Sequence, residues 1–326
     1  MRPFPPSGLL AALGLLSLPA AAADAGFATS EGPDRLTITQ AGRPVAEFVF
    51  RDERILRPYF ANVHAPGGLQ VTRRHPPVAG VDPDDHDTMH PGLWLAFGDV
   101  NGADFWRNKG RIEHVRFVES PRAEGKRLRF ATECRLLAPT GEVIGSVTNR
   151  FALTGLTEGW LIEWEATFQS DAGPLVFGDQ EEMGFGARVA TPITEKNGGR
   201  IRSSAGLETA KVTWGQPADW CDYSGRMGDR RAGLLLMADP VNFRPSWWHN
   251  RNYGLTVANP FGRAAMRQGD PSLVTVPRGA PFRLRFAALV YSVEAEVTID
   301  GDAVFGNFAG TRKAGGPFRE GPDGRN

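Results

Sequence analysis

Cysteine is scarce in this 326-residue sequence, which contains only Cys134 and Cys221. Two thiols are too few for a thiolate zinc cluster, and in an oxidising compartment they allow at most one disulfide. Net charge is also lacking, because 37 Lys and Arg balance 37 Asp and Glu. Without a basic stretch, the chain has no electrostatic footprint for nucleic acid or anionic lipid. We therefore expect a neutral or weakly charged ligand, either a small molecule or an oligosaccharide.

Apolar runs long enough to span a membrane are missing as well. The longest, residues 9–18, follows Arg2 and precedes the small residues at 20–23. This order of charged, apolar and small residues is that of a secretion signal. The apolar stretch is about half of the roughly 20 residues that a spanning helix needs. We predict that residues 1–23 are a signal peptide, and that the mature protein is periplasmic or extracellular with no membrane span.

Helical periodicity is absent too, since no segment keeps a 3.6-residue repeat for longer than about three turns. No internal repeat or linker divides the chain, and 39 Gly and 25 Pro separate many short segments instead. We predict a single domain over residues 24–314. The polar, glycine-rich residues 315–326 are expected to form a disordered tail.

Several of the short segments alternate with period two. Residues 127–136, 160–168 and 281–292 place apolar side chains on one face and mostly charged ones on the other. Such segments are typical of half-buried strands in an antiparallel sheet. Residues 35–50 should form two strands around a turn at 41–43. The predicted fold is mostly β, a large antiparallel β-sandwich, with long loops at 61–92, 99–111, 170–185, 194–230 and 239–253.

The stretch 84–92, DDHDTMHPG, holds two of the six histidines. In a strand, His86 and His90 would lie about 13 Å apart, whereas a loop or a single helical turn would bring them together. The flanking Asp, Pro and Gly favour the loop or turn. Such a pair could transfer protons or bind a substrate, with Asp85 or Asp87 holding the tautomer. The alternative is a surface turn whose histidines only bond the backbone.

A third histidine, His64, lies in another Gly- and Pro-rich segment and is a candidate for substrate binding. Three histidines with a carboxylate would suit zinc, so a metal site formed by His64, His86 and His90 is a further alternative. The sequence contains no P-loop, dinucleotide fingerprint or nucleophile elbow. The cofactor, if there is one, is therefore unknown from the sequence.

An acidic turn, Asp179-Gln-Glu-Glu182, precedes a predicted strand near Gly184. A carboxylate opposite a histidine is the usual equipment for proton transfer at a sugar carbon or hydroxyl. Glu181 and Glu182 are the candidates for this role. The alternative is a solvated acidic turn.

Aromatic residues gather in two expected loops, WGQPADWCDYSG at 214–225 and NFRPSWWHNRNYG at 242–254. Flat rings with neighbouring Asp, Asn and Arg match the apolar faces and hydroxyl edges of a sugar ring. At least one tryptophan of the 247–248 pair is instead expected to cover a core edge. The resulting candidates for substrate binding are Trp106, Trp220, Asp222, Arg244 and Trp247.

The sequence resembles the bacterial PmoA-like, or "methane oxygenase PmoA", family over nearly the whole mature chain, and five blocks carry the resemblance. The label names a membrane copper enzyme, whose subunits are mostly membrane helices. The chain does not support that activity, and we treat the label as a misnomer. The blocks are RPYFANVHAPGGLQVTRRHPP, DHDTMHPGLWLAFGDVNGADFWRNKG, EEMGFGARVATPITEKNGG, WCDYSG and RPSWWHNRNYGLTVANPFG.

The resemblance implies a sugar-processing setting and a sandwich similar to the galactose-mutarotase supersandwich. In mutarotase-like enzymes a histidine acid and a carboxylate base act on the sugar ring. By analogy of residue type, His86, His90 or His249 would work with Glu181 or Glu182.

We therefore predict an exported carbohydrate-active protein that acts on a sugar or an oxidised sugar by proton transfer, as an epimerase, lyase or hydrolase. A non-catalytic carbohydrate-binding or scaffold protein is the alternative. The histidine loop 84–92, the acidic turn 179–182 and the aromatic loop 244–249 are expected to meet at one end of the sandwich, because all three interrupt the alternating pattern beside a well-patterned strand.

Overall fold

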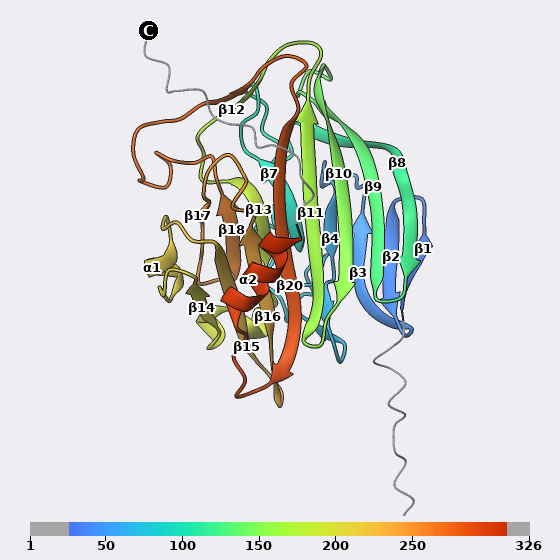
Figure 1. Cartoon of the computed structure of the whole chain (residues 1–326), viewed down its shortest axis with the longest axis vertical. Coiled ribbons are helices and arrows are strands. Elements are labelled where there is room, and N and C mark those ends of the chain that lie inside the picture. The colour runs from blue at the N-terminus through green and yellow to red at the C-terminus, as the bar shows by residue number, and fades with distance from the viewer. Residues whose placement is uncertain (1–25, 312–326) are drawn as a thin grey trace, which may run out of the picture.

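The computed structural model describes residues 26–311 as two large antiparallel sheets packed face to face (Figure 1). The predicted β-sandwich is therefore confirmed. The predicted signal peptide and the predicted tail lie outside the described residues.

The first sheet has eight strands and carries the chemistry described below. Its order places neighbours in sequence side by side at one edge, while the centre combines strands from distant parts of the chain. Across the sheet the strands are β1 (Phe27–Glu31), β2 (Arg35–Gln40), β3 (Arg43–Val49), β4 (Tyr59–Ala61), β7 (Leu93–Phe97), β13 (Met183–Arg188), β18 (Leu255–Asn259) and β17 (Trp247–Trp248).

The second sheet also has eight strands, most of them longer. The strands at 127–136, 160–168 and 281–292 expected from the period-two pattern all belong to it. Across the sheet they are β14 (Arg200–Ser203), β15 (Trp220–Met227), β16 (Arg230–Ala238), β20 (Phe282–Glu294), β11 (Gly159–Gln169), β10 (Val143–Gly155), β9 (Arg127–Leu137) and β8 (Arg111–Glu124).

Short elements fill the connections. Two small two-stranded sheets and four short helical segments occur among the described residues. They are β5 (His64–Ala65) with β6 (Leu69–Gln70), β12 (Leu175–Phe177) with β19 (Val274–Val276), the 3-10 turns Thr191–Ile193 and Glu195–Asn197, and the helices α1 (Ala210–Thr213) and α2 (Gly301–Gly310).

The main core lies between the two sheets. Alternate residues of each strand face the partner sheet, as the period-two pattern predicts. Phe48 of the first sheet lies 5.2 Å from Phe130 of the second, and Phe60 lies 5.8 Å from Trp164, measured between ring centroids. Because one face of each strand fills this core, the other face is available for loops or solvent.

The outer face of the second sheet is drier than the sequence suggests, because α2 lies across β20 (Figure 1). Phe308 of α2 packs into a separate apolar cluster with Leu289 and Trp220. The guanidinium of Arg285, in a segment expected to show a wet face, is buried beneath the helix and pairs with Asp239 and Glu163. The period-two pattern could not reveal this cover, which comes from another part of the chain.

The two cysteines do not form the disulfide that their number allows. Cys134 on β9 and Cys221 on β15 are free and fully buried. Five strand-to-strand steps separate β15 from β9, a distance of about 24 Å at roughly 4.8 Å per step. A disulfide requires Cα atoms within about 7 Å. Burial raises the pKa of both thiols to about 12.

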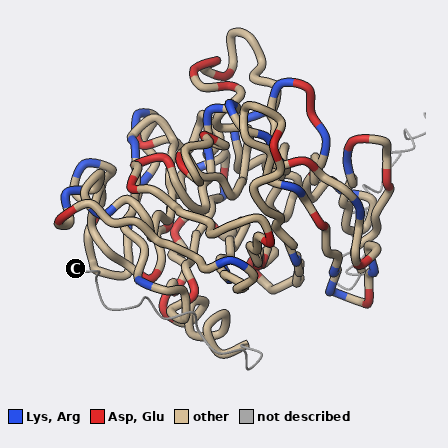
Figure 2. Tube along the Cα trace, turned by 90° about the horizontal axis from the view of Figure 1, so that it is seen from above, with Lys and Arg blue, Asp and Glu red and all other residues tan. Residues whose placement is uncertain are grey.

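Charged residues of both signs are interspersed along the loops when the molecule is seen from above (Figure 2). No helix formed by residues 26–311 combines the length and the apolar character needed to cross a bilayer.

Candidate functional site

The histidine loop is the helical turn that the sequence predicts. The backbone N–H of His90 donates to the carbonyl of His86 at 2.8 Å. The two imidazole rings therefore stack, with centroids 5.0 Å apart. His86 is exposed, its Nδ1 lies 3.0 Å from Asp85 Oδ2, and its ring lies nearly parallel to that of Tyr253. The loop thus presents one accessible imidazole held by a carboxylate.

His90 has a different environment from His86. Its ring is buried and lies parallel to the indole of Trp94, with centroids 5.3 Å apart, while Trp106 meets it edge-on. Burial, followed by the nearby charges of Arg188 and His86, holds the pKa of His90 well below its usual range. His90 is therefore a neutral packing residue of the loop at physiological pH.

Two buried arginines hold this loop in place, and neither was singled out from the sequence. Arg188 forms a two-pronged pair with Asp85, at 2.8 and 2.9 Å. Arg73 donates to the backbone carbonyls of Asp85 and His90. Both guanidinium side chains are only 1% exposed. Burial alone would raise the pKa of Asp85, but the bonds from Arg188 and His86 and the charges of both arginines hold it well below its usual range.

A cavity of about 390 Å³ opens beside this loop. Its wall combines the carboxylate and imidazole of the loop with the half-buried ring of Tyr253, over which the Arg188 guanidinium lies at 4.4 Å. The volume falls within the range of small-molecule sites. The lining residues are Pro83, Asp85, His86, Arg188, Val189, Thr191, Thr194, Lys196, Asn197 and Tyr253.

A histidine and a carboxylate meet a short way along the same sheet. Glu181 lies just before β13, and His249 lies between β17 and β18. His249 Nδ1 is 3.0 Å from the backbone carbonyl of Glu181, and its Nε2 is 3.5 Å from Glu181 Oε1. The same Oε1 accepts the indole N–H of Trp214 at 2.6 Å and a guanidinium N–H of Arg251.

The charge states of this pair follow from its surroundings. Burial alone would raise the pKa of Glu181, but the charges of His249 and Arg251 and the Trp214 hydrogen bond lower it below its usual value. Burial lowers the pKa of His249, against the opposing effect of Glu181. At neutral pH we therefore assign a carboxylate and a neutral imidazole. A carbonyl only accepts, so Nδ1 carries the hydrogen and Nε2 carries a lone pair.

The histidine loop and the Glu181–His249 pair lie on the outer face of the first sheet. On β13, Phe185 and Ala187 point into the main core, so Gly186 and Arg188 point outward. A Cβ on Gly186 would come within 2.9 Å of the Trp94 ring, so glycine lets that indole lie across the strand. Burial raises the pKa of Tyr253, and the charges of Arg188 and Asp85 beside the loop and of Arg251 and Glu181 of the pair also act on it. Tyr253 therefore lies between the two groups.

The three loops that were expected to meet do so only in part. The acidic turn meets the segment ending at His249, but the loop at 84–92 lies at the opposite end of the paired strands β7 and β13, because Leu93 pairs with Ala187 and Phe97 with Met183. Glu182 points away from the pair and binds Arg107 at 2.6 Å. The predicted carboxylate candidates are thus separated by the structure, with Glu181 on the histidine and Glu182 on an arginine.

Several predicted binding residues lie elsewhere. Trp220 and Asp222 are in strand β15, not in a loop. The indole of Trp220 donates to Asp302, and Asp222 is buried against Arg202 and Tyr291. Their polar groups thus have structural partners beneath α2, and the prediction of a loop at these two residues is wrong.

Trp106 is fully buried under the histidine loop, so it presents no face to a ligand. Trp247 and Arg244 stack against each other at the edge strand β17, where Arg244 also bonds Ser272. Trp248 fills the core, as expected for one member of that pair.

The predicted three-histidine metal site does not form. His64 lies in the small hairpin β5–β6, where its Nδ1 is 2.6 Å from the carbonyl of Asn62. Among residues 26–311, no three His, Cys, Asp or Glu side chains are grouped so that they could hold one metal ion. His64 therefore joins neither His86 nor His90 as a ligand set.

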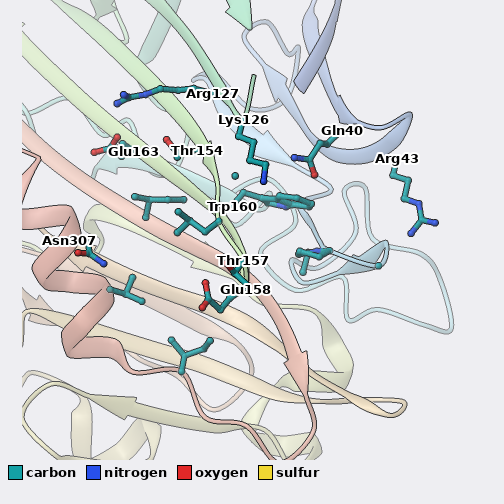
Figure 3. Close-up of a pocket in the computed structure, with 18 of the residues that line it drawn as sticks. Gln40, Arg43, Lys126, Arg127, Thr154, Thr157, Glu158, Trp160, Glu163 and Asn307 are labelled. Carbon is teal, nitrogen blue, oxygen red and sulfur yellow. The ribbon is translucent and has the colours of Figure 1, made fainter. Parts of the chain in front are cut away.

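A larger cavity, of about 1020 Å³, lies beside α2 and the turns that join β2 to β3 and β10 to β11 (Figure 3). Trp160 lies at its centre, with Lys126 and Gln40 on one side and Glu158 on the other. Its lining includes no histidine and none of the predicted site residues. It therefore offers no histidine–carboxylate pair.

Because His90 is buried and His86 is exposed, replacing them should have different effects on the free energy of unfolding. Replacing His90 by Ala should lower the free energy of unfolding by about 2–4 kcal/mol, because it empties a packed aromatic site. Replacing the exposed His86 by Ala should cost less than about 0.5 kcal/mol. Urea unfolding of both variants measures the difference. Equal costs would contradict the placement of the two rings, and only the His86 variant is suited to activity assays.

Comparisons with known proteins give a family but no activity. One family model matches residues 35–298, and it is that of DUF6807, a family of unknown function. No curated protein matches the chain. The resemblance to the PmoA-like family is therefore wrong, since the matching model is a different one.

Solved structures with a similar course of the chain include three proteins from lactobacilli. An alpha-galactosidase from Lactobacillus brevis is 9% identical with a TM-score of 0.40, and the match covers 82% of this chain but 39% of that one. A galactose mutarotase-like protein from Lactobacillus casei ATCC 334 is 11% identical, with a TM-score of 0.34 and coverage of 82% and 100%. A galactose mutarotase related enzyme from Lactobacillus acidophilus is 11% identical, with a TM-score of 0.33 and coverage of 84% and 100%. TM-scores this low carry no argument about function.

Proposed function

The chain belongs to DUF6807, a family of unknown function, and we propose that it transfers a proton on a small polyhydroxylated molecule of the sugar class. The observation that carries this proposal is the contact between His249 Nε2 and Glu181 Oε1 at 3.5 Å. A neutral imidazole and a carboxylate in this arrangement can together take up one proton, because the imidazolium that forms is stabilised by the adjacent negative charge.

The exposure of the two side chains decides which one meets the ligand. Glu181 is 26% exposed, whereas His249 is 3% exposed. Oε1 of Glu181 is already bonded, but Oε2 accepts no hydrogen bond from residues 26–311. Glu181 is therefore the group that takes the proton from the ligand through Oε2. His249 lies behind it with Nε2 against Oε1. When the protonated carboxyl group turns to present its O–H to Nε2, His249 takes up the proton and the carboxylate is restored.

A sugar fits the surroundings of the pair. The half-buried rings of Tyr253 and Trp214 lie beside the pair, and the guanidinium groups of Arg188 and Arg251 lie over them, so that flat rings and hydrogen-bond donors occur together. The exposed His86 and Asn197 offer hydrogen bonds at the rim of the neighbouring cavity. This combination suits the C–H faces and hydroxyl edges of a sugar ring. Epimerases and lyases that act beside a carbonyl begin by removing a proton from carbon, whereas a hydrolase moves a proton to or from oxygen, so exchange of a C–H proton would favour the first two.

Deuterium exchange tests the proposal without knowledge of the reaction. Reducing sugars, keto-sugars and uronates are incubated with the protein in D₂O and followed by ¹H NMR. We expect loss of a C–H signal at one position, or a new product, for at least one compound. Binding without exchange or product, for every compound that binds, would favour the alternative of a non-catalytic carbohydrate-binding protein.

The proposal includes export, which rests on the signal-peptide pattern of residues 1–23. An exported protein would meet its ligand in the periplasm or outside the cell.

A further inference from the structure

A second cavity, of about 590 Å³, lies directly beside the Glu181–His249 pair. Two of its lining residues, Trp214 and Arg251, are those that bond Glu181 Oε1. A ligand in this cavity would therefore lie next to the reacting carboxylate. The complete lining is Glu195, Ala210, Lys211, Trp214, Asn250, Arg251, Asn252 and Arg267.

The cavity is positively charged. Three of its side chains are cations, Lys211, Arg251 and Arg267, against the single carboxylate of Glu195. Arg251 is neutralised by Glu181, which lies behind it. Within residues 26–311, neither Lys211 nor Arg267 forms an ion pair. Two cations thus face the cavity without a partner of opposite charge.

Arg267 is held in this position by its backbone and by an aromatic ring. Its φ is +60°, in the left-handed region that costs a non-glycine residue about 1 kcal/mol. Its guanidinium lies 5.4 Å from the centre of the Trp214 ring, and that of Arg251 lies 5.7 Å from the same ring. A Cβ on Gly215 would come within 2.8 Å of the carbonyl of Met266, so this glycine allows the two loops to approach.

From this arrangement we infer that the ligand carries a carboxylate, as a uronic acid does, and that Arg267 and Lys211 bind it. The inference rests on the proposed function and specifies its substrate class. A guanidinium presents two parallel N–H groups that match the two oxygens of a carboxylate. The Trp214 face holds the guanidinium plane, while its indole N–H fixes Glu181. Trp214 thus contacts both the arginine that would bind the acid group of the ligand and the carboxylate of Glu181 that accepts the proton.

Binding measurements on the full chain test the inference. Glucuronate and galacturonate are compared with glucose and galactose by calorimetric titration at a fixed salt concentration. We expect the uronates to bind about tenfold more tightly, the range of one charge-assisted hydrogen-bonded pair. Raising the salt concentration should weaken uronate binding and leave the neutral sugars unaffected.

Two variants locate the effect. Arg267→Gln should weaken uronate binding about tenfold, and Lys211→Gln less, because a lysine makes a point contact rather than a fork. Neither should change binding of a neutral sugar. The matched control is Arg122→Gln, which removes an exposed arginine of β8 whose ion-pair partner among residues 26–311 is Glu124.

The outcomes separate the two levels of the proposal. Equal affinity for uronates and neutral sugars, or unchanged uronate binding in Arg267→Gln, overturns the inference and leaves the proposed function standing. Uronate binding that depends on Arg267, together with deuterium exchange that does not depend on Glu181, overturns the assignment of the proton transfer to Glu181 and leaves the inference standing. Absence of binding by all four sugars overturns both.

Discussion

Glu181→Gln is expected to lower the rate of proton transfer by about 10²–10⁴-fold, the usual contribution of a general base. The amide keeps the size of the side chain and can still accept the Trp214 hydrogen bond, but it cannot take a proton through Oε2. The rate of deuterium exchange into the ligand measures the effect. Stability should change little, because Glu181 is partly exposed and its pair with Arg251 is open to solvent.

The loss of activity at acidic pH tests whether Glu181 and His249 act in the reaction or only stabilise the structure. His249 must be neutral to hold the proton, and burial lowers its pKa from the usual value of a histidine, so activity should persist at neutral pH and fall only at acidic pH. The negative charge of Glu181 opposes this lowering. Without that charge the pKa of His249 falls further, and the residual activity of Glu181→Gln should be lost at a lower pH than in the parent chain.

A matched control for this variant is Glu165→Gln. Glu165 also pairs with an arginine, Arg283, but lies on the second sheet. Glu165→Gln should retain the exchange rate and the pH profile of the parent chain. An unchanged exchange rate in Glu181→Gln, or an equal loss in both variants, would remove Glu181 from the reaction.

Asp85→Ala is expected to cost about 3–5 kcal/mol of the free energy of unfolding, the range for removing one partner of a buried ion pair. Asp85 is the only carboxylate of the described residues that pairs with Arg188 or Arg73. Its loss would leave two guanidinium groups, each 1% exposed, close together without a counter-charge. Arg188→Met should cost less, roughly 1–2 kcal/mol, since Asp85 is 38% exposed and can be hydrated.

Urea unfolding measures the difference between the costs of Asp85→Ala and Arg188→Met. The variant that carries both substitutions should be more stable than Asp85→Ala alone. The exposed pair of Asp34 and Arg35 provides the control, where Asp34→Ala should cost less than about 1 kcal/mol. Because the pKa of Asp85 is lowered by folding, its contribution is present at neutral pH and is lost as acid protonates it. A larger cost for Arg188→Met than for Asp85→Ala would contradict the arrangement.

Much of the fold could be predicted from the sequence because its strands are long and one-sided. Segments such as 127–136 and 160–168 show an apolar face every second residue, and that face fills the core. The turn at 41–43 was predicted in the same way, and positive φ at Ala41 and Gly42 forms it. The strand containing Trp220 and Asp222 was missed because both of its faces are covered, so no alternation marks it.

The candidate site was predicted only in part. The spacing of His86 and His90 indicates a helical turn, because local geometry depends on neighbours in sequence. Glu181 and His249 are 68 residues apart, and they meet because β13 pairs with β18, a register that no local pattern specifies. Arg188 could have been found from the sequence, since it is the one charged residue in the otherwise uncharged stretch 183–189.

The two isolated thiols have a consequence for the order of events in the life of the protein. A chain that we propose is secreted passes through an oxidising compartment while it is still unfolded, and only then can an oxidant reach Cys134 or Cys221. Once the sheets close, both sulfurs are buried, mostly protonated and too far apart to join. The folded protein then offers nothing for a disulfide-forming catalyst to act on, so the redox state of its surroundings affects how many chains fold but not the structure of those that have folded.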